Sequence, residues 1–141
     1  MKPEISEWPL LLVSAELDAA TDDGFRLREL TEALATGHDC RVIPSCTYED
    51  ALEVCASRAD LGAVVIDWDL PLDECGEKLR PECLLHCIRR RNKCIPVLLM
   101  TDRMETEALP AEVLSGIDDC LWKTADTPDF IAGRIAVHIE N

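Results

Sequence analysis

The chain has 141 residues, about the size of one ordinary domain and too few for two. Hydrophobic residues make up 48% and charged residues 30%, a balance typical of a globular domain with an aliphatic core. The 28 acidic and 14 basic residues give a formal charge of -14, which repels phosphate backbones and anionic lipid headgroups, so nucleic acid and membrane are not expected partners.

The amino-terminal segment and the cysteines together indicate a cytoplasmic protein. The first apolar run, residues 9–13, is too short for a signal peptide, and no stretch is long enough to span a membrane. Without an export signal, the eight cysteines are expected to remain reduced thiols. Cys83 and Cys87 share a predicted helix face near His86, but the paired Cys-x-x-Cys knuckles of structural zinc are absent, so we expect no metal site.

The first part of the chain predicts strands and helices in alternation. Residues 9–14 form an apolar run typical of a buried strand, and residues 21–37 have the start and stop residues of a helix, with Gly37 at its end. Residues 40–43 predict a second strand that ends at Pro44, and Thr47-x-x-Asp50 opens a second helix. The side chains expected to face the core from these two helices are Leu27, Leu30, Leu34, Ala51, Val54 and Cys55.

The same alternation continues to the end of the chain. Residues 63–67 predict a third strand, residues 70–79 a loop, and Pro81 the start of a helix. Residues 96–100 predict a fourth strand, followed by a short helix around residues 110–114, a fifth strand at residues 120–122 and a last helix capped at Thr127. Their expected core residues are Leu84, Leu85, Ile88, Phe130, Ile131, Ile135 and Ile139.

Five repeats of strand then helix predict one three-layer α/β domain over residues 1–141. The sheet is expected to be parallel and covered by helices on both faces, because continuous apolar strands need cover on both sides and parallel crossovers are right-handed. Ligands of such sheets bind beyond the carboxyl ends of the strands. Ser14, Asp67, Thr101 and Lys123 are therefore expected at one rim.

The residues at this rim resemble the receiver domains of bacterial two-component systems, over nearly the whole chain. Asp67-Trp68-Asp69-Leu70-Pro71 matches the phosphoacceptor motif of that family. Residues 95–101 look like its fourth strand with a switch hydroxyl at Thr101, and residues 116–123 like its fifth strand with a phosphate-binding lysine at Lys123. The resemblance implies a flavodoxin-like sheet with strand order 2-1-3-4-5.

The carboxylate pair that holds a divalent cation in receivers is missing after the first strand. Val13 is followed by Ser14 and Ala15, which leaves Glu16 one place further along. Magnesium requires several oxygen ligands in a near-octahedral array, and phosphoryl transfer without the cation loses its main electrostatic support. Asp67 is therefore interpreted as the remnant of a phosphoacceptor, which forms an ion pair with Lys123 and caps a loop amide.

A narrower resemblance accounts for these departures. Residues 97–103, residues 121–123 and, most specifically, residues 126–135 resemble the amino-terminal wing domain of bacterial ornithine, lysine and arginine decarboxylases, which is similar to receivers but is not phosphorylated. The resemblance implies that catalysis belongs to a downstream domain that binds pyridoxal phosphate through a Ser-x-His-Lys motif. None of the four lysines here follows a histidine, so we expect this chain alone to be neither an enzyme nor a cofactor-binding protein.

The resemblance also implies partners, namely a catalytic domain in cis and neighbouring subunits of a homo-oligomer. Three functions remain open: an assembly domain of a decarboxylase, a phospho-accepting signalling receiver, and a stand-alone pseudo-receiver interaction module. The excess of carboxylates adds a hypothesis, because protonating some of them in acid would weaken repulsion between subunits and favour association. The charge could equally serve only to keep the surface soluble.

One basic cluster interrupts this acidic chain. It consists of Arg89, Arg90, Arg91, Asn92 and Lys93, near the carboxyl end of a predicted helix. One interpretation is a solvated cluster whose charge offsets the helix macrodipole. The other is a contact with an acidic neighbour or with an anionic effector nucleotide, as the resemblance to some lysine-type decarboxylases implies.

Overall fold

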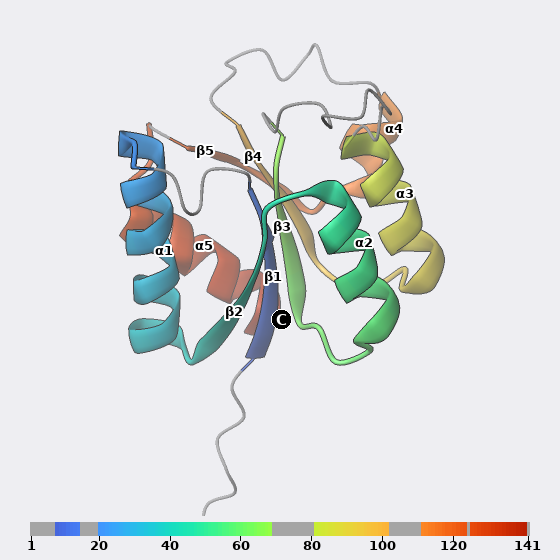
Figure 1. The fold of residues 1–141 in the computed structure, drawn as a ribbon, viewed down its shortest axis with the longest axis horizontal. Coiled ribbons are helices and arrows are strands. Elements are labelled where there is room, and N and C mark those ends of the chain that lie inside the picture. The colour runs from blue at the N-terminus through green and yellow to red at the C-terminus, as the bar shows by residue number, and fades with distance from the viewer. Residues whose placement is uncertain (1–7, 15–19, 69–80, 102–110, 124, 141) are drawn as a thin grey trace, which may run out of the picture.

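A parallel five-stranded sheet with the order β2-β1-β3-β4-β5 forms the centre of the molecule (Figure 1). The computed structural model describes residues 8–14, 20–68, 81–101, 111–123 and 125–140. The predicted α/β class and the strand order are confirmed. The strands are β1 (Trp8–Val13), β2 (Cys40–Ser45), β3 (Ala63–Asp67), β4 (Val97–Thr101) and β5 (Asp119–Trp122).

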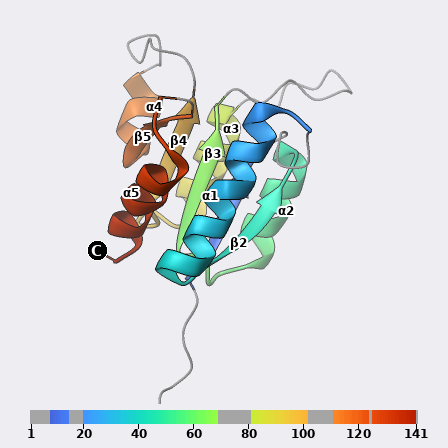
Figure 2. The ribbon, with the colours of Figure 1, turned by 90° about the vertical axis from the view of Figure 1, so that its left-hand side faces the viewer.

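Helices cover both faces of the sheet and make the molecule a three-layer sandwich. Helices α1 (Asp22–His38) and α5 (Pro128–Glu140) pack side by side on one face (Figure 2). Helices α2 (Tyr48–Ser57), α3 (Pro81–Arg91) and α4 (Ala111–Gly116) lie on the other (Figure 1). The predicted loop at residues 70–79 lies outside the described residues.

The sheet divides the core into two hydrophobic halves because successive strand residues point to opposite faces. In β1, Leu10 and Leu12 join the half beneath α1 and α5, while Leu11 and Val13 join the half beneath α2, α3 and α4. All four side chains are fully buried. Burial on both faces explains why the strands read as unbroken apolar runs.

Threonine side chains cap the helices α1, α2 and α5 at the predicted positions. Thr21 accepts a hydrogen bond from the Gly24 amide at 3.1 Å, and Thr47 accepts one from the Asp50 amide at 3.0 Å. Thr127 caps α5 in the same way. Each hydroxyl satisfies one of the amide groups that have no partner within their own helix.

The predicted end of the first helix at Gly37 is wrong by one residue. Helix α1 continues through Gly37 to His38, and Asp39 closes it with a φ of 55°. The Asp39 amide donates to the Leu34 carbonyl. Aspartate is one of the few residues with a side chain that tolerates this left-handed conformation, so it takes the place that glycine usually fills.

The prediction that Pro44 ends the second strand is also wrong, because β2 continues to Ser45. Strand β2 lies at the edge of the sheet and pairs only with β1. The Ser45 carbonyl points toward β1, where it accepts a hydrogen bond from the Ser14 amide at 2.9 Å. The backbone nitrogen of the preceding residue, Pro44, therefore faces the open edge, where no donor is required.

Phe130 was expected in the core, but its side chain is 49% exposed. The buried stripe of α5 instead consists of Ile131, Ala132, Ile135 and Ala136. Phe130 lies one residue outside this stripe, which is a rotation of about 100° around the helix. The Arg134 guanidinium lies over its ring, 5.8 Å from the centroid, which gives the exposed aromatic surface a cation–π contact.

Candidate functional site

The candidate site lies where four strands end. Ser14 follows β1, Asp67 ends β3, Thr101 ends β4, and Lys123 follows β5. The parallel register pairs Val13 with Ile66, Asp67 with Met100 and Thr101 with Trp122, so the four positions meet at one rim as predicted. All four side chains are buried.

Asp67 and Lys123 form a buried ion pair at this rim. The Lys123 Nζ atom lies 3.1 Å from each carboxylate oxygen of Asp67. Their side chains are only 2% and 6% exposed. The Ser14 hydroxyl donates to the Asp67 Oδ2 atom at 2.8 Å. The Asp67–Lys123 pair that the sequence suggested is therefore present, with Ser14 as a third member.

Backbone hydrogen bonds beyond the ends of the strands hold these side chains in place. The Lys123 amide donates to the Thr101 carbonyl at 3.0 Å, which extends the pairing of β4 and β5 by one residue. On the other side of β4, the Trp68 amide donates to the Met100 carbonyl at 2.8 Å and so extends the pairing of β3 and β4. Asp67 and Lys123 thus lie next to residues whose backbone is fixed in the sheet.

Among the four side chains at the rim, Asp67 is the one carboxylate. Both oxygens of Asp67 contact the Lys123 ammonium, and Ser14 offers a neutral hydroxyl where a receiver has a metal-binding carboxylate. Within the described ranges, no group of three or more histidine, cysteine, aspartate or glutamate side chains could hold a metal ion. Glu16 lies outside the described residues. The ammonium of Lys123 balances the charge of the Asp67 carboxylate in this buried pair.

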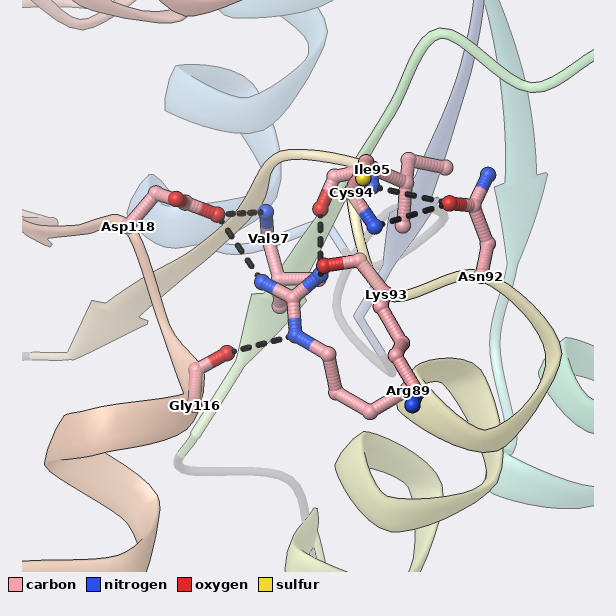
Figure 3. A network of polar contacts seen from close by, with 8 residues as sticks. All are labelled: Arg89, Asn92, Lys93, Cys94, Ile95, Val97, Gly116 and Asp118. Atoms are coloured by element: carbon pink, nitrogen blue, oxygen red, sulfur yellow. Dashed lines mark hydrogen bonds and ion pairs between the residues drawn. The ribbon is translucent and has the colours of Figure 1, made fainter.

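A second polar network surrounds Arg89, at the opposite end of the sheet (Figure 3). Its guanidinium donates to the Gly116 carbonyl at 2.9 Å, to the Ile95 carbonyl at 2.6 Å and to the Asp118 carboxylate at 3.0 Å. A further hydrogen bond of 3.1 Å reaches the Lys93 carbonyl. Arg89 therefore ties the end of α3 to the segments that enter β4 and β5.

Asp118 completes this network, and it was not singled out from the sequence. Its Oδ2 atom accepts a hydrogen bond from the Val97 amide at 2.8 Å as well as one from Arg89. Twenty-nine residues separate Asp118 from Arg89, so only the fold brings them together. The acidic pair Asp118-Asp119, directly before the predicted fifth strand at residues 120–122, was the one available clue in the sequence.

The remaining residues of the basic cluster have separate roles. The Asn92 side chain accepts hydrogen bonds from the amides of Cys94 and Ile95, at 2.9 and 3.1 Å, and so shapes the turn into β4. Arg91 donates to the Ala56 carbonyl across the gap between α3 and α2. Arg90 is exposed. Arg89 and Asn92 thus have internal partners, while an effector contact through this cluster stays a prediction.

Asp119 joins the edge strand β5 to helix α5. Its Oδ2 atom accepts a hydrogen bond from Arg134 and lies 3.0 Å from the His138 Nε2 atom. Burial works against ionisation of Asp119, but the hydrogen bonds with His138 and Arg134 outweigh it and lower the pKa of this carboxyl below 3.8. Sequence reasoning placed no functional role on Asp119.

Ser45 also lies at the carboxyl end of its strand, yet its hydroxyl takes no part in the site. The side chain is buried, and its oxygen has no hydrogen-bond partner within the described part of the chain.

None of the helices in the described ranges combines the length and apolar character needed to cross a bilayer.

Comparison with known proteins identifies relatives of this fold and of this sequence. The family model "Orn/Lys/Arg decarboxylase, N-terminal domain" matches residues 23–141. The biodegradative arginine decarboxylase of Escherichia coli (strain K12) is 27% identical over 127 residues. This alignment covers 89% of the chain but only 16% of that relative, so the chain spans a small part of its length.

Solved structures share the fold. Lysine decarboxylase A from Pseudomonas aeruginosa matches with a TM-score of 0.77 and 20% identity, over 97% of this chain and 19% of that one. A receiver domain from Methanospirillum hungatei JF-1 matches with a TM-score of 0.73 and 16% identity, over 96% of this chain and 95% of that one. At these identities the structures establish a CheY-like, flavodoxin-like fold. The match of the family model to residues 23–141 places the chain in the family of Orn/Lys/Arg decarboxylase N-terminal domains.

Proposed function

We propose that this chain is a non-catalytic domain that mediates subunit packing and oligomer assembly, and that its receiver-like site no longer accepts a phosphoryl group. The observation that carries the proposal is the buried Asp67–Lys123 pair with Ser14. A phosphoacceptor must expose a carboxylate oxygen to its donor and to a cation. Here both oxygens of Asp67 contact the lysine, and the carboxylate is nearly inaccessible to solvent.

Membership of the decarboxylase family supports a cis arrangement with a catalytic domain. Decarboxylases of this family are generally pyridoxal-phosphate enzymes, and the relatives matched here are several times longer than this chain. The present sequence has no Ser-x-His-Lys motif, so the cofactor and the substrate pocket would belong to the other domain. The coding sequence adjoining this chain tests the arrangement, since a stand-alone interaction module would lack a pyridoxal-phosphate domain.

Incubation of the chain with magnesium and acetyl phosphate tests the loss of phosphorylation. Intact-mass spectrometry is expected to show no added phosphoryl group, because no cation is held beside Asp67 to neutralise the incoming charge. A receiver domain of known activity, treated in parallel, controls for the phosphodonor. An added phosphoryl group on this chain that disappears in the variant Asp67→Asn would contradict the proposal and favour a signalling receiver.

Sedimentation equilibrium tests the assembly role. The chain is expected to associate reversibly, and more strongly at about pH 5 than at about pH 8, because protonation of some surface carboxylates reduces the repulsion between subunits. The large excess of acidic residues makes this repulsion strong at neutral pH. A mass that stays monomeric at every concentration and at both pH values would contradict the assembly role.

A further inference from the structure

The outer side of the α2–α3 layer contains a groove, at the end of the sheet opposite to Asp67. Its volume is about 470 Å³, and it lies between the carboxyl ends of helices α2 and α3. The apolar part of its lining includes Cys55, Leu61, Ile88 and Ile95. An open groove with an apolar lining is a surface that a protruding side chain of another protein can fill.

Positive charge gathers around this groove. Arg58 and Arg91 line it, and the exposed residues Arg90 and Lys93 lie on the last turn of α3 and just beyond it. We call these four residues the basic end of the layer. Arg58 is paired with Asp60 at 2.9 Å, so the other three provide most of the net charge. Such a concentration of positive charge is notable in a chain with twice as many acidic as basic residues.

The opposite end of α2 is acidic. Glu49, Asp50 and Glu53 are exposed there and line a shallow depression of about 380 Å³ together with Cys46 and Thr47. We call these three acids the acidic end. Glu49, Glu53 and Ala56 are spaced i, i+4 and i+7, so they follow one stripe along the outside of α2. Ala56 lines the groove, and the stripe therefore leads from the acidic end directly to the basic end.

From this arrangement we propose that the α2–α3 layer binds a second copy of the chain across a two-fold axis, with the acidic end of each copy against the basic end of the other. The inference deepens the proposed assembly function and rests on it. A two-fold contact uses the same surface on both subunits, which requires one surface that carries both charges. The ten residues of α2 span about 15 Å, so two antiparallel copies of this helix bring both pairs of ends together at once.

Electrostatics favours a second copy as the occupant. Two chains with a charge of -14 repel each other unless their few basic residues lie against acidic ones. At physiological ionic strength the Debye length is about 8 Å, so charges in direct contact outweigh those on distant faces. The two ends provide this contact twice in a symmetric pair. The apolar groove adds burial that charge pairing alone does not supply.

Charge reversal at one residue of each end tests the contact. Glu49→Lys and Arg90→Glu are suitable because both side chains are exposed on helices. Each change appears twice in a symmetric pair, so each variant alone is expected to raise the dimer dissociation constant about tenfold. An equimolar mixture of the two variants is expected to recover the wild-type value, because lysine at 49 then faces glutamate at 90 and the second contact is unchanged. The double variant is expected to recover it as well.

Matched changes on the opposite face control for net charge. Glu32→Lys and Arg28→Glu alter exposed residues of α1, and neither is expected to weaken the pair by more than about twofold. Circular dichroism checks that every variant is folded. Sedimentation equilibrium of the 141-residue chain gives the dissociation constants.

The outcomes separate this inference from the assembly function. Loss of association in the single variants and recovery in the mixture support the two-fold contact. Association that is unaffected by Glu49→Lys and Arg90→Glu overturns the α2–α3 contact while leaving the assembly function in place. Weakening in the single variants without recovery in the mixture overturns the pairing of the acidic end with the basic end. A wild-type chain that never associates overturns both.

Discussion

Replacing Lys123 with methionine is expected to be among the most destabilising single changes at the rim. Methionine has a similar length and leaves no gross cavity, but it removes both 3.1 Å contacts to the Asp67 carboxylate. The carboxylate, with a side-chain exposure of 2%, then keeps the hydrogen bond from the Ser14 hydroxyl but is a buried charge that has lost its ammonium partner. Breaking one half of a buried ion pair in this way costs about 3–5 kcal/mol.

A loss of this size is a large part of the about 5–15 kcal/mol that stabilises a typical domain. Urea unfolding of Lys123→Met and of the wild type measures it as a shift in midpoint at constant slope. Adding Asp67→Asn removes the stranded charge and is expected to recover about 2 kcal/mol. Lys93→Met is the matched control, because that lysine is exposed and its loss is expected to change stability by less than about 0.5 kcal/mol. A loss below about 1 kcal/mol for Lys123→Met would refute the reasoning.

Three further changes test other parts of the structure. Arg89→Lys is expected to lower the free energy of unfolding, measured in urea, by about 2 kcal/mol, since one ammonium cannot reach Gly116, Ile95 and Asp118 together. Arg90→Lys, at an exposed position, is the control and is expected to leave the stability unchanged. Ser45→Ala is expected to raise the free energy of unfolding by up to about 1 kcal/mol, because it removes a buried hydroxyl that has no partner among the described residues; a loss of similar size would show that the hydroxyl is satisfied. Asp119→Asn is expected to destabilise the chain at neutral pH. Because folding lowers the pKa of Asp119, its contribution to stability is present above pH 3.8 and disappears as the pH falls through the lower folded value. The free energies of unfolding of wild type and variant should therefore converge in acid. A difference that persists there would contradict the Asp119 contacts.

The alternation of strands and helices was predictable because burial imposes it directly on the sequence. Strands covered on both faces must be apolar throughout, and Thr21, Thr47 and Thr127 cap helices by contacts within a few residues. The error at Pro44 arose because the outcome there depends on distant parts of the chain. Pro44 is tolerated only because β2 is an edge strand, and edge position is a property of the whole sheet.

The rim was predictable for a related reason. In a parallel sheet all strands end at the same edge, so Ser14, Asp67, Thr101 and Lys123 had to converge once the strands were assigned. The partners of Arg89 were not predictable, since the carbonyl groups of Gly116 and Ile95 leave no trace in the sequence. The sequence indicated an unusual basic cluster but could not distinguish a residue that ties elements together from one that faces solvent.

We propose that Lys123 and Ser14 close the receiver-like rim and leave no place for a cation or a phosphoryl group. The most direct test is a titration of the chain with magnesium and beryllofluoride, followed through the backbone amide resonances by nuclear magnetic resonance. The amide resonances of Asp67, Thr101 and Lys123 are expected not to shift. Saturable shifts at these three amides that vanish in Asp67→Asn would contradict it.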